Sequence, residues 1–266
     1  MARSPLMHLM IKAADKAARG LKRDFSEIEH LQVSRKGARD FVTNADLTAE
    51  QTIKEELAAA RPDFGFLMEE SGASGPEEKR WIVDPLDGTT NFIHGIPHFA
   101  INIAIEVVGQ IVACVTYDPI KEEMFTSEKG RGAFLNDRRI RVSERERLEE
   151  CVIGFGNQLR DSRSMEHVMG RLGNVTQSVG ATRRMGSAAL DMAYVAAGRF
   201  EGFYEGGLKP WDLAAGTLLV KEAGGSVQTR LEGKTVLETG EVIASNTRIH
   251  NTFCDLLRVK VDSSLN

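Results

Sequence analysis

The chain has few cysteines, few prolines and no long hydrophobic run. Its three cysteines, Cys114, Cys151 and Cys254, lie far apart in 266 residues. An odd and scattered set of thiols is not a disulfide framework, so we expect a protein of the reducing cytoplasm. The count of 7 prolines and 25 glycines excludes collagen-like and low-complexity chains. No apolar run reaches the ~18 residues of a membrane span, and the sequence after Arg3 lacks the features of a signal peptide.

An excess of one charge sign is also lacking. The chain carries 34 Lys and Arg against 38 Asp and Glu, for a net charge of −4, with 42% hydrophobic and 27% charged residues. This is the composition of an ordinary globular protein, long enough for one large domain or two small ones. We expect no general attraction to nucleic acid. Basic pairs such as Arg183-Arg184 leave a local contact with RNA or a partner protein open, although solvated charge is the simpler explanation.

The hydrophobic pattern predicts an α+β first half and an α/β second half. Predicted helices cover residues 5–25, 47–60, 162–172, 187–197, 213–223 and 248–259. Predicted strands cover residues 81–83, 99–108, 111–117, 123–127, 132–142, 152–155, 202–204 and 242–244. Residues 36–46 read as a polar loop that leads into a helix. We divide the chain at the charge-rich segment 142–150, into residues 1–145 and 146–266, as two halves of one compact unit with the active site between them.

Two acids follow the short apolar run at residues 81–83. Asp84 ends this run, and Asp87 follows three residues later. Gly88 allows a ligand to approach the backbone closely, and Thr89 can begin a helix whose free N–H groups favour a phosphate. Carboxylate and carbonyl oxygens are the ligands that Mg²⁺ prefers. The stretch therefore predicts a magnesium ion held between the protein and a phosphate.

Other acids also lie where an element begins or ends. Glu69 and Glu70 follow the apolar run at residues 64–68, and Asp212 precedes the apolar helix predicted at residues 213–223. Taken singly, each has an ordinary explanation, because Asp is a common helix N-cap and adjacent glutamates are common in solvated turns. The repetition of acids at element ends favours one shared site.

Together these motifs resemble the inositol monophosphatase family, in its bacterial branch. Residues 81–92, WIVDPLDGTTNF, match the first signature of that family without a gap, and residues 211–216, WDLAAG, resemble the second. Residues 40–46 and 69–71 are also typical of the family, and the resemblance covers about residues 5–260. It implies a layered αβαβα sandwich and a homodimer. It also implies a Mg²⁺-dependent, lithium-sensitive phosphatase of small polyol phosphates, with myo-inositol 1-phosphate as the favoured substrate.

The resemblance also implies roles for individual residues. The metal ligands it implies, for two to three Mg²⁺ ions, are Glu69, Asp84, Asp87, Asp212 and the carbonyl of Leu86. The residues it places at the nucleophilic water or behind the metals are Glu69, Thr89, Asp46, Thr43 and Glu70. The substrate contacts it implies are Leu86, Asp87, Gly88, Thr89, Gly186, Ser187, Ala188, Glu205 and Asp212.

Several alternatives stay open beside inositol phosphate hydrolysis. Histidinol-phosphate phosphatases and fructose-1,6-bisphosphate phosphatases carry similar signatures and share the same metal site. Thr90-Asn91 stands where the branch that acts on 3′-phosphoadenosine phosphates typically has Lys-Glu, which argues against a nucleotide substrate. A regulatory role through RNA or protein binding, with catalysis secondary, is an alternative from another class.

The expected dimer interface is the segment 160–184, which mixes Met and Arg residues that are enriched at interfaces. The alternative is that the apolar residues of this segment pack beneath their own helix.

Overall fold

The structure is a computed structural model that describes residues 3–27, 33–37, 40–156 and 162–258. Its larger sheet has eight strands in the order β10-β9-β8-β7-β6-β5-β3-β4. These strands are β3 (Gly65–Met68), β4 (Gly72–Ser74), β5 (Lys79–Asp87), β6 (Ala100–Val107), β7 (Gln110–Asp118), β8 (Glu123–Glu128), β9 (Gly132–Leu135) and β10 (Arg138–Ile140). Only the pair β3 and β5 is parallel among these neighbours.

The second sheet has five strands in the order β12-β11-β13-β15-β14. They are β11 (Val152–Phe155), β12 (Ala181–Arg183), β13 (Gly202–Gly206), β14 (Ser226–Gln228) and β15 (Glu241–Ser245). The helices are α1 (Pro5–Ser26), α2 (Asn44–Ala60), α3 (Thr89–Ile93), α4 (Ser162–Ser178), α5 (Ala188–Ala196), α6 (Pro210–Glu222), α7 (Val236–Thr239) and α8 (His250–Leu256), with a short 3₁₀ turn at Leu148–Glu150.

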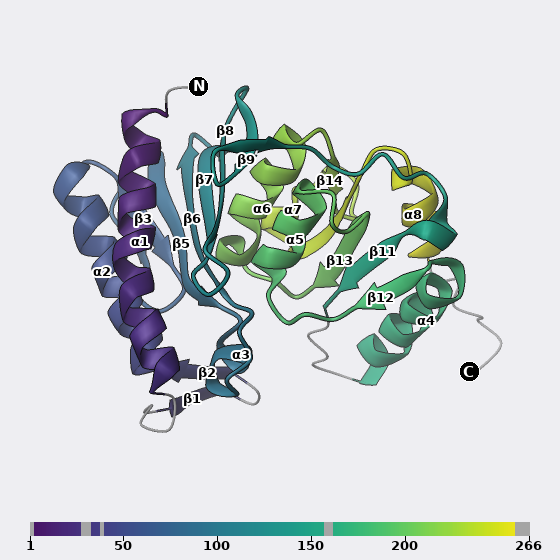
Figure 1. Cartoon of the computed structure of the whole chain (residues 1–266), viewed down its shortest axis with the longest axis horizontal. Helices are drawn as coiled ribbons and strands as arrows, with labels where there is room; N and C mark the ends of the chain where they lie inside the picture. The colour runs from purple at the N-terminus through teal and green to yellow at the C-terminus, as the bar shows by residue number, and fades with distance from the viewer. Residues whose placement is uncertain (1–2, 28–32, 38–39, 157–161, 259–266) are drawn as a thin grey trace.

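Helices and sheets alternate in layers, as Figure 1 shows. Helices α1 and α2 cover one face of the larger sheet, and α5 and α6 pack between its other face and the second sheet. Helices α4 and α8 lie against the far side of the second sheet. The predicted αβαβα sandwich is therefore confirmed.

The central helices are apolar on all sides because a sheet lies on each side of them. Every residue of α5 is buried. Gly216 of α6 lets the two helices approach closely, since a Cβ atom there would lie 2.6 Å from Cβ of Met192 on α5. Helix α6 contacts both sheets, so the two predicted halves pack against each other. The division of the chain at residues 145–146 stays a prediction. In the described part of the chain, no helix is long and apolar enough to cross a membrane.

Several predicted boundaries are wrong. The polar loop predicted at residues 36–46 instead holds the end of strand β1 (Val33–Gly37), strand β2 (Asp40–Thr43) and the start of α2. Strands β1 and β2 pair with each other, and their sequence lacks apolar alternation. The strand predicted at residues 132–142 is two strands, because Asn136 and Asp137 take φ of 45° and 65° and turn the chain. The helix from Ser162 continues past residue 172 to Ser178.

The other predicted elements lie close to the observed ones. The strand predicted to stop at residue 84 continues to Asp87 as β5. The predicted last helix covers only His250–Leu256, and its predicted end at Val259 lies outside the described residues.

Candidate active site

An irregularity in β5 places two acids on one side of the sheet. Asp84 pairs with Asn102 and Asp87 pairs with Ala100, so three steps along β5 match two steps along β6. Alternation along a regular strand would point side chains three residues apart to opposite faces, and a β-bulge corrects this by one residue. Leu86 lies within the bulge, and its N–H donates to Oδ1 of Asp84 (2.9 Å).

Glu69 reaches the same edge from the neighbouring strand. Because β3 runs parallel to β5 with Met68 beside Val83, Glu69 follows at the level of Asp84, and its N–H donates to the carbonyl of Val83 (3.1 Å). Parallel strands end at the same edge of a sheet, which is where ligands bind in such folds. The two acids that the sequence places at strand ends therefore meet.

Asp212 arrives from the start of α6. Its Oδ2 accepts from the N–H of Lys209 (2.7 Å) and so caps the helix. The helix start is tied to the larger sheet by Asn102, whose amide donates to the carbonyl of Trp211 (3.1 Å). The N-cap position itself is Lys209, so Asp212 is not the N-cap: it lies three residues further on, inside the first turn, and accepts from the N-cap backbone.

Asp84, Asp87 and Asp212 form what we call the acidic cluster. One carboxylate oxygen from each lies within 4.8 Å of the others, which is close enough to hold a metal ion. Burial, with the charges of Glu69, Asp87 and Asp212, raises the pKa of Asp84 well above its usual range. Burial and the charge of Asp87 do the same to the pKa of Asp212. A donor set of oxygen atoms that repel one another fits a hard cation.

Beside the acidic cluster, Thr43, Asp46 and Thr89 form a hydrogen-bonded group. Oδ2 of Asp46 accepts from the hydroxyl (2.5 Å) and the N–H (2.9 Å) of Thr43. Oδ1 of Asp46 lies 3.2 Å from the hydroxyl of Thr89, which is also 3.1 Å from the carbonyl of Leu86. Asp46 is fully buried, and burial raises its pKa. These hydrogen bonds connect the start of α2 to the start of α3.

Gly88 connects β5 to α3 in the left-handed conformation. Its φ is 98°, and a Cβ atom there would lie 3.2 Å from the carbonyl oxygen of His98. A larger side chain would therefore be strained and crowded. The amides of Gly88 and Thr89 stand at the start of α3, next to the bulge that carries Asp87.

The second half of the chain approaches Asp87 through the start of α5. The hydroxyl of Ser187 (2.5 Å) and the N–H of Ala189 (2.8 Å) donate to Oδ2 of Asp87. Ser187 also caps α5. Ser187 thus orients a cluster acid in addition to the substrate contact that the resemblance implies.

Glu205 lies in β13 and is electrostatically linked to the same acid. Burial, with the charge of Asp87, raises the pKa of Glu205 to about 8, and Arg184 opposes the shift. Gly156 makes room for this side chain, because a Cβ atom there would lie 1.9 Å from a carboxylate oxygen of Glu205.

The chain is similar to known proteins along nearly its whole length. The profile of the inositol monophosphatase family matches residues 2–261. The chain belongs to the inositol monophosphatase family. An inositol-1-monophosphatase of Mesorhizobium japonicum is 54% identical over 92% of this chain and 93% of its own length. A Nus factor SuhB of Pseudomonas aeruginosa is 40% identical over 98% of both chains.

A solved structure shows the same fold. The extragenic suppressor protein suhB of Bartonella henselae superposes with a TM-score of 0.94 at 50% identity, over 97% of this chain and all (100%) of that one.

Sequence analysis missed several residues that position the site of this inositol monophosphatase family member. The carboxylate of Glu50 on α2 accepts from the N–H groups of Glu70 (2.8 Å) and Ser71 (2.9 Å) and fixes the turn after β3. The amide of Asn91 donates to the carbonyls of His98 and Met185 (2.8 Å each), which joins α3 to the loop before Gly186. Such bonds span up to 94 residues of sequence, so no local pattern marks them.

Asp191 is a further buried acid that the sequence did not single out. It lies on α5 and is 1% exposed. Burial, with the charges of Glu205 and Asp87, raises its pKa well above the usual range.

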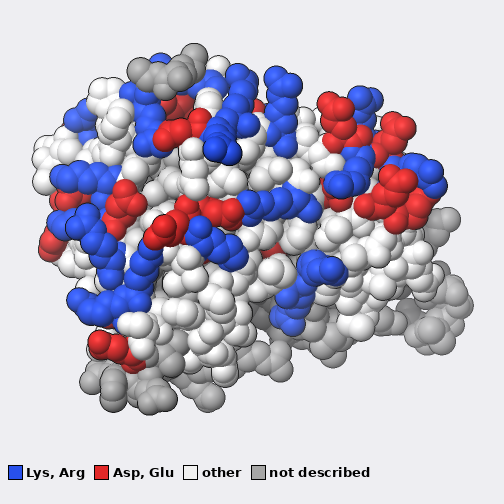
Figure 2. All heavy atoms as spheres, viewed as in Figure 1, with Lys and Arg blue, Asp and Glu red and all other residues white. Residues whose placement is uncertain are grey.

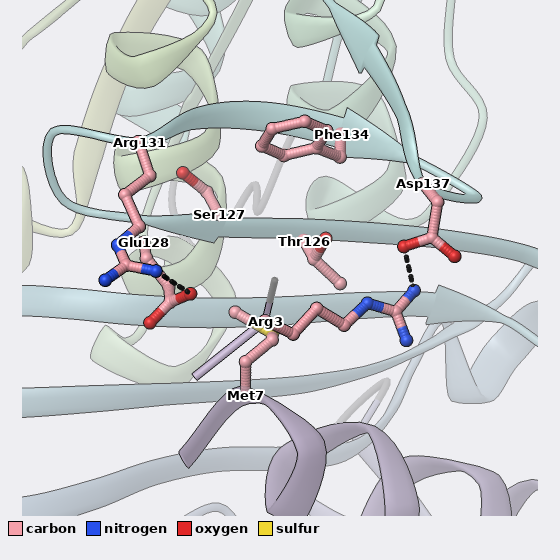
Figure 3. Close-up of a pocket in the computed structure, with 8 residues that line it drawn as sticks. All are labelled: Arg3, Met7, Thr126, Ser127, Glu128, Arg131, Phe134 and Asp137. Atoms are coloured by element: carbon pink, nitrogen blue, oxygen red, sulfur yellow. Dashed lines mark hydrogen bonds and ion pairs between the residues drawn. The ribbon is translucent and has the colours of Figure 1, made fainter. Parts of the chain in front are cut away.

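Two cavities lie away from the acidic cluster. A cavity of about 160 Å³ lies between the start of α1 and strands β8 and β9. Figure 3 shows that its charged side chains pair with one another, Arg3 with Asp137 and Arg131 with Glu128. A larger groove of about 800 Å³ lies between the two sheets. Neither cavity is lined by an acid of the cluster.

Proposed function

We propose that the protein hydrolyses myo-inositol 1-phosphate to myo-inositol and phosphate at the acidic cluster, with Mg²⁺ bound there. Its membership of the inositol monophosphatase family makes it a phosphatase of phosphate monoesters. The observation that carries the site assignment is the meeting of Asp84, Asp87 and Asp212 beside the Thr89–Asp46 hydrogen bond. Carboxylates that meet without a cation repel a phosphate dianion, so a metal is required by the charge alone.

In this proposal Glu69, Asp84, Asp87, Asp212 and the carbonyl of Leu86 hold two to three Mg²⁺ ions. Such ions would reverse the local charge, acidify a bound water and stabilise the leaving alkoxide. The chain itself contributes positioning. The hydroxyl of Thr89 donates its proton toward Asp46 or the Leu86 carbonyl, so its remaining lone pair is free to accept from water and orient it. Thr43 holds Asp46 in place for this role, and the turn that carries Glu69 and Glu70 is held by Glu50.

The alcohol part of the substrate would lie against the second half of the chain. Glu205, Gly186, Ser187 and Ala188 are the contacts that we propose. A carboxyl with a pKa of about 8 is largely protonated at neutral pH, so Glu205 can both donate to and accept from a hydroxyl group. The amides of Gly88 and Thr89 would bind the phosphate at the start of α3.

Release of inorganic phosphate from a panel of substrates tests the proposal. The panel contains myo-inositol 1-phosphate, glycerol 2-phosphate, histidinol phosphate, fructose 1,6-bisphosphate and 3′-phosphoadenosine 5′-phosphate. We expect the highest kcat/KM for the inositol ester. A higher value for histidinol phosphate or fructose 1,6-bisphosphate would establish that alternative instead. Lithium is proposed to inhibit at millimolar concentration with fixed Mg²⁺, and indifference to it would contradict a typical family site.

A regulatory role is the second candidate, because several relatives are named Nus factor SuhB and one is 40% identical along nearly the whole chain. Arg183 is exposed at the end of β12, and Figure 2 shows basic and acidic side chains intermingled over one face rather than a broad basic surface. We propose that any such contact is local. In a pull-down from a lysate, the Asp87→Asn variant should retain transcription proteins as wild type does, whereas the Arg183→Glu variant should lose them. If neither wild type nor Asp87→Asn retains such proteins, catalysis is the sole role.

We also propose a homodimer through the segment 160–184. Within α4, Met169 is 53% exposed whereas Val175 is fully buried, so only part of the helix is available to a partner. Arg160 and the side chain of Met165 lie outside the described residues. Sedimentation with and without Mg²⁺ tests this, and an active monomer at micromolar concentration would refute it. The cytoplasmic location also stays a prediction.

A further inference from the structure

The groove of about 800 Å³ is separate from the active site and has apolar walls. On one side it is bounded by β5 and the turn between β6 and β7, and on the other by β14 and α7, with the second half of α6 between them. Its apolar lining consists of Ile82, Ile111, Leu218, Val227, Val236 and Leu237. Its volume is that of a site for a small organic molecule, for which ~300–1,000 Å³ is usual.

Four basic and three acidic side chains surround this apolar lining. The groove is also lined by Arg80, Lys129, Lys221 and Lys234. Two of them already have carboxylate partners, Arg80 in Glu106 (2.6 Å) and Lys234 in Glu238 (3.3 Å). The carboxylate of Glu222 is occupied by the N–H groups of Gly130 and Gly132 (2.7 and 2.8 Å).

Two lysines at the groove therefore remain without a carboxylate partner among the described residues. Lys129 donates only to the neutral amide oxygen of Gln110 (2.6 Å). Lys221 is exposed and makes no ion pair within the described ranges. Glu222 keeps its charge, because neutral N–H groups bond it, so the two lysines without ion-pair partners leave the lining with an excess of one positive charge.

A buried hydroxyl adds a second, independent observation. Thr217 lines the groove and is 8% exposed. Its Oγ1 is shielded from solvent and has no hydrogen-bond partner in the part of the chain that the structure describes. A buried polar atom without a partner costs free energy, and a bound ligand would supply the missing partner. Thr217 and Lys221 are four residues apart on α6, so their side chains share one face of the helix.

Exposed apolar side chains adjoin the groove. Val108 is 76% exposed and Leu231 is 58% exposed, and they are two of the few large apolar side chains that are largely exposed in the described residues. Val108 precedes the groove residue Gly109, and Leu231 follows the groove residue Thr229 by two positions. Apolar surface of this kind commonly marks a binding site.

We propose that this groove binds a small amphiphilic carboxylate, with its apolar body along Leu218 and Val227 and its carboxylate between Thr217 and Lys221. The apolar walls match an alkyl chain, and the unpaired lysines match one negative head group. The hydroxyl of Thr217 donates to the same head group. The site is independent of phosphate hydrolysis, because none of these residues belongs to the acidic cluster.

Calorimetric titration of the full chain with decanoate, below its micelle concentration, tests the proposal. We expect one saturable site per chain. Lys221→Glu should weaken binding by about tenfold or more because it replaces attraction with repulsion. Thr217→Val, which keeps the volume and removes the hydroxyl, should weaken binding about threefold. Lys12→Glu on α1 is the matched control for charge and should bind as wild type does.

Two further measurements keep the outcome unambiguous. Decanol has the same alkyl chain without the charge, and we expect it to bind at least about tenfold more weakly than decanoate. Phosphate release by Lys221→Glu should equal that of wild type, which shows that the variant is folded. Absence of saturable binding, equal binding of decanol and decanoate, or equal binding by Lys221→Glu and wild type would each overturn the proposal.

Discussion

Two groups of buried acids in this protein differ in what surrounds them. Outside the active site, Glu106 bonds Arg80 (2.6 Å), Asp118 bonds Lys121 (2.5 Å) and Glu201 bonds Arg145 (2.8 Å). In the acidic cluster, the charges that act on Asp84 are those of Glu69, Asp87 and Asp212, all of them negative. Burial alone does not separate the groups, because Asp84 of the cluster is as inaccessible as the paired acids Asp118 and Glu201.

The difference separates buried acids that a counter-charge stabilises from the acids that we propose to bind metal. A buried carboxylate is tolerated when a cation or N–H groups satisfy it. Where like charges meet instead, the protein carries an electrostatic cost that a bound cation would remove and that protonation removes without one. A functional assignment therefore rests more firmly on the missing counter-charge than on the acid itself.

The largest expected effect is loss of catalysis from the unpaired group. Asp212→Asn and Asp87→Asn should each lower kcat/KM for myo-inositol 1-phosphate by ~10²-fold or more, since each removes a charge that holds the metal. Thermal unfolding should show that both variants remain folded. The matched control is Glu106→Gln, a paired acid, which should retain activity. Full activity of the cluster variants at excess Mg²⁺ would contradict the assignment.

Substitution of an acid in the paired group should lower stability and leave catalysis unchanged. The carboxylate of Glu201 accepts from Arg145 and also from the N–H of Val152 (2.7 Å). Arg145 is more than half exposed, and glutamine has one acceptor oxygen, which can serve only one of these two donors. Glu201→Gln should lower the free energy of unfolding by ~1–3 kcal/mol, measured by urea denaturation, without changing kcat. A variant with unchanged stability and a reduced kcat would contradict the structural role of Glu201.

The acids at the active site should also make the stability of the protein depend on pH. The pKa of Glu205 rises from 4.5 to about 8 on folding, and those of Asp84 and Asp212 also rise. Between these values the folded state binds more protons than the unfolded state, so stability falls as pH increases. In EDTA, Tm should fall by several degrees between about pH 5 and about pH 8, and excess Mg²⁺ should reduce the fall. A Tm that rises over this range would contradict the shifts.

The smallest expected effect on stability concerns an uncharged buried group, the hydroxyl of Thr217. The hydroxyl of Thr217 is buried without a hydrogen-bond partner among the described residues. Thr217→Val should therefore raise the free energy of unfolding by about 1 kcal/mol, a rise of roughly 2–4 °C in Tm, while Thr116→Val, which breaks a bond to Asn102 (2.6 Å), should lower it. Destabilisation by both would show that Thr217 is satisfied in solution.

Much of the site could be predicted because its residues are contiguous. Asp84, Asp87, Gly88 and Thr89 lie on one strand–bulge–helix segment, and β5 carries them together. The partners that hold the segment could not be predicted. Asn102 bonds the backbone of Asp212 from 110 residues away, and Gly156 matters only because Glu205 fills its space. The pairing of β1 and β2 was missed for a related reason, since main-chain hydrogen bonds rather than apolar alternation hold those strands.

The origin of the site residues in two halves of the chain bears on how new activities arise. The acids Glu69, Asp84 and Asp87 and Thr89, which we propose to orient the water, come from the turn after β3, from β5 and from α3, whereas the proposed alcohol contacts Glu205 and Gly186 come from β13 and the loop before α5. Substitutions in the second set can alter the alcohol that is recognised without moving the first. We expect divergence within such a lineage to proceed by substitution of the alcohol-facing residues, while the acids of the cluster, including Asp212 of the second half, are inherited intact.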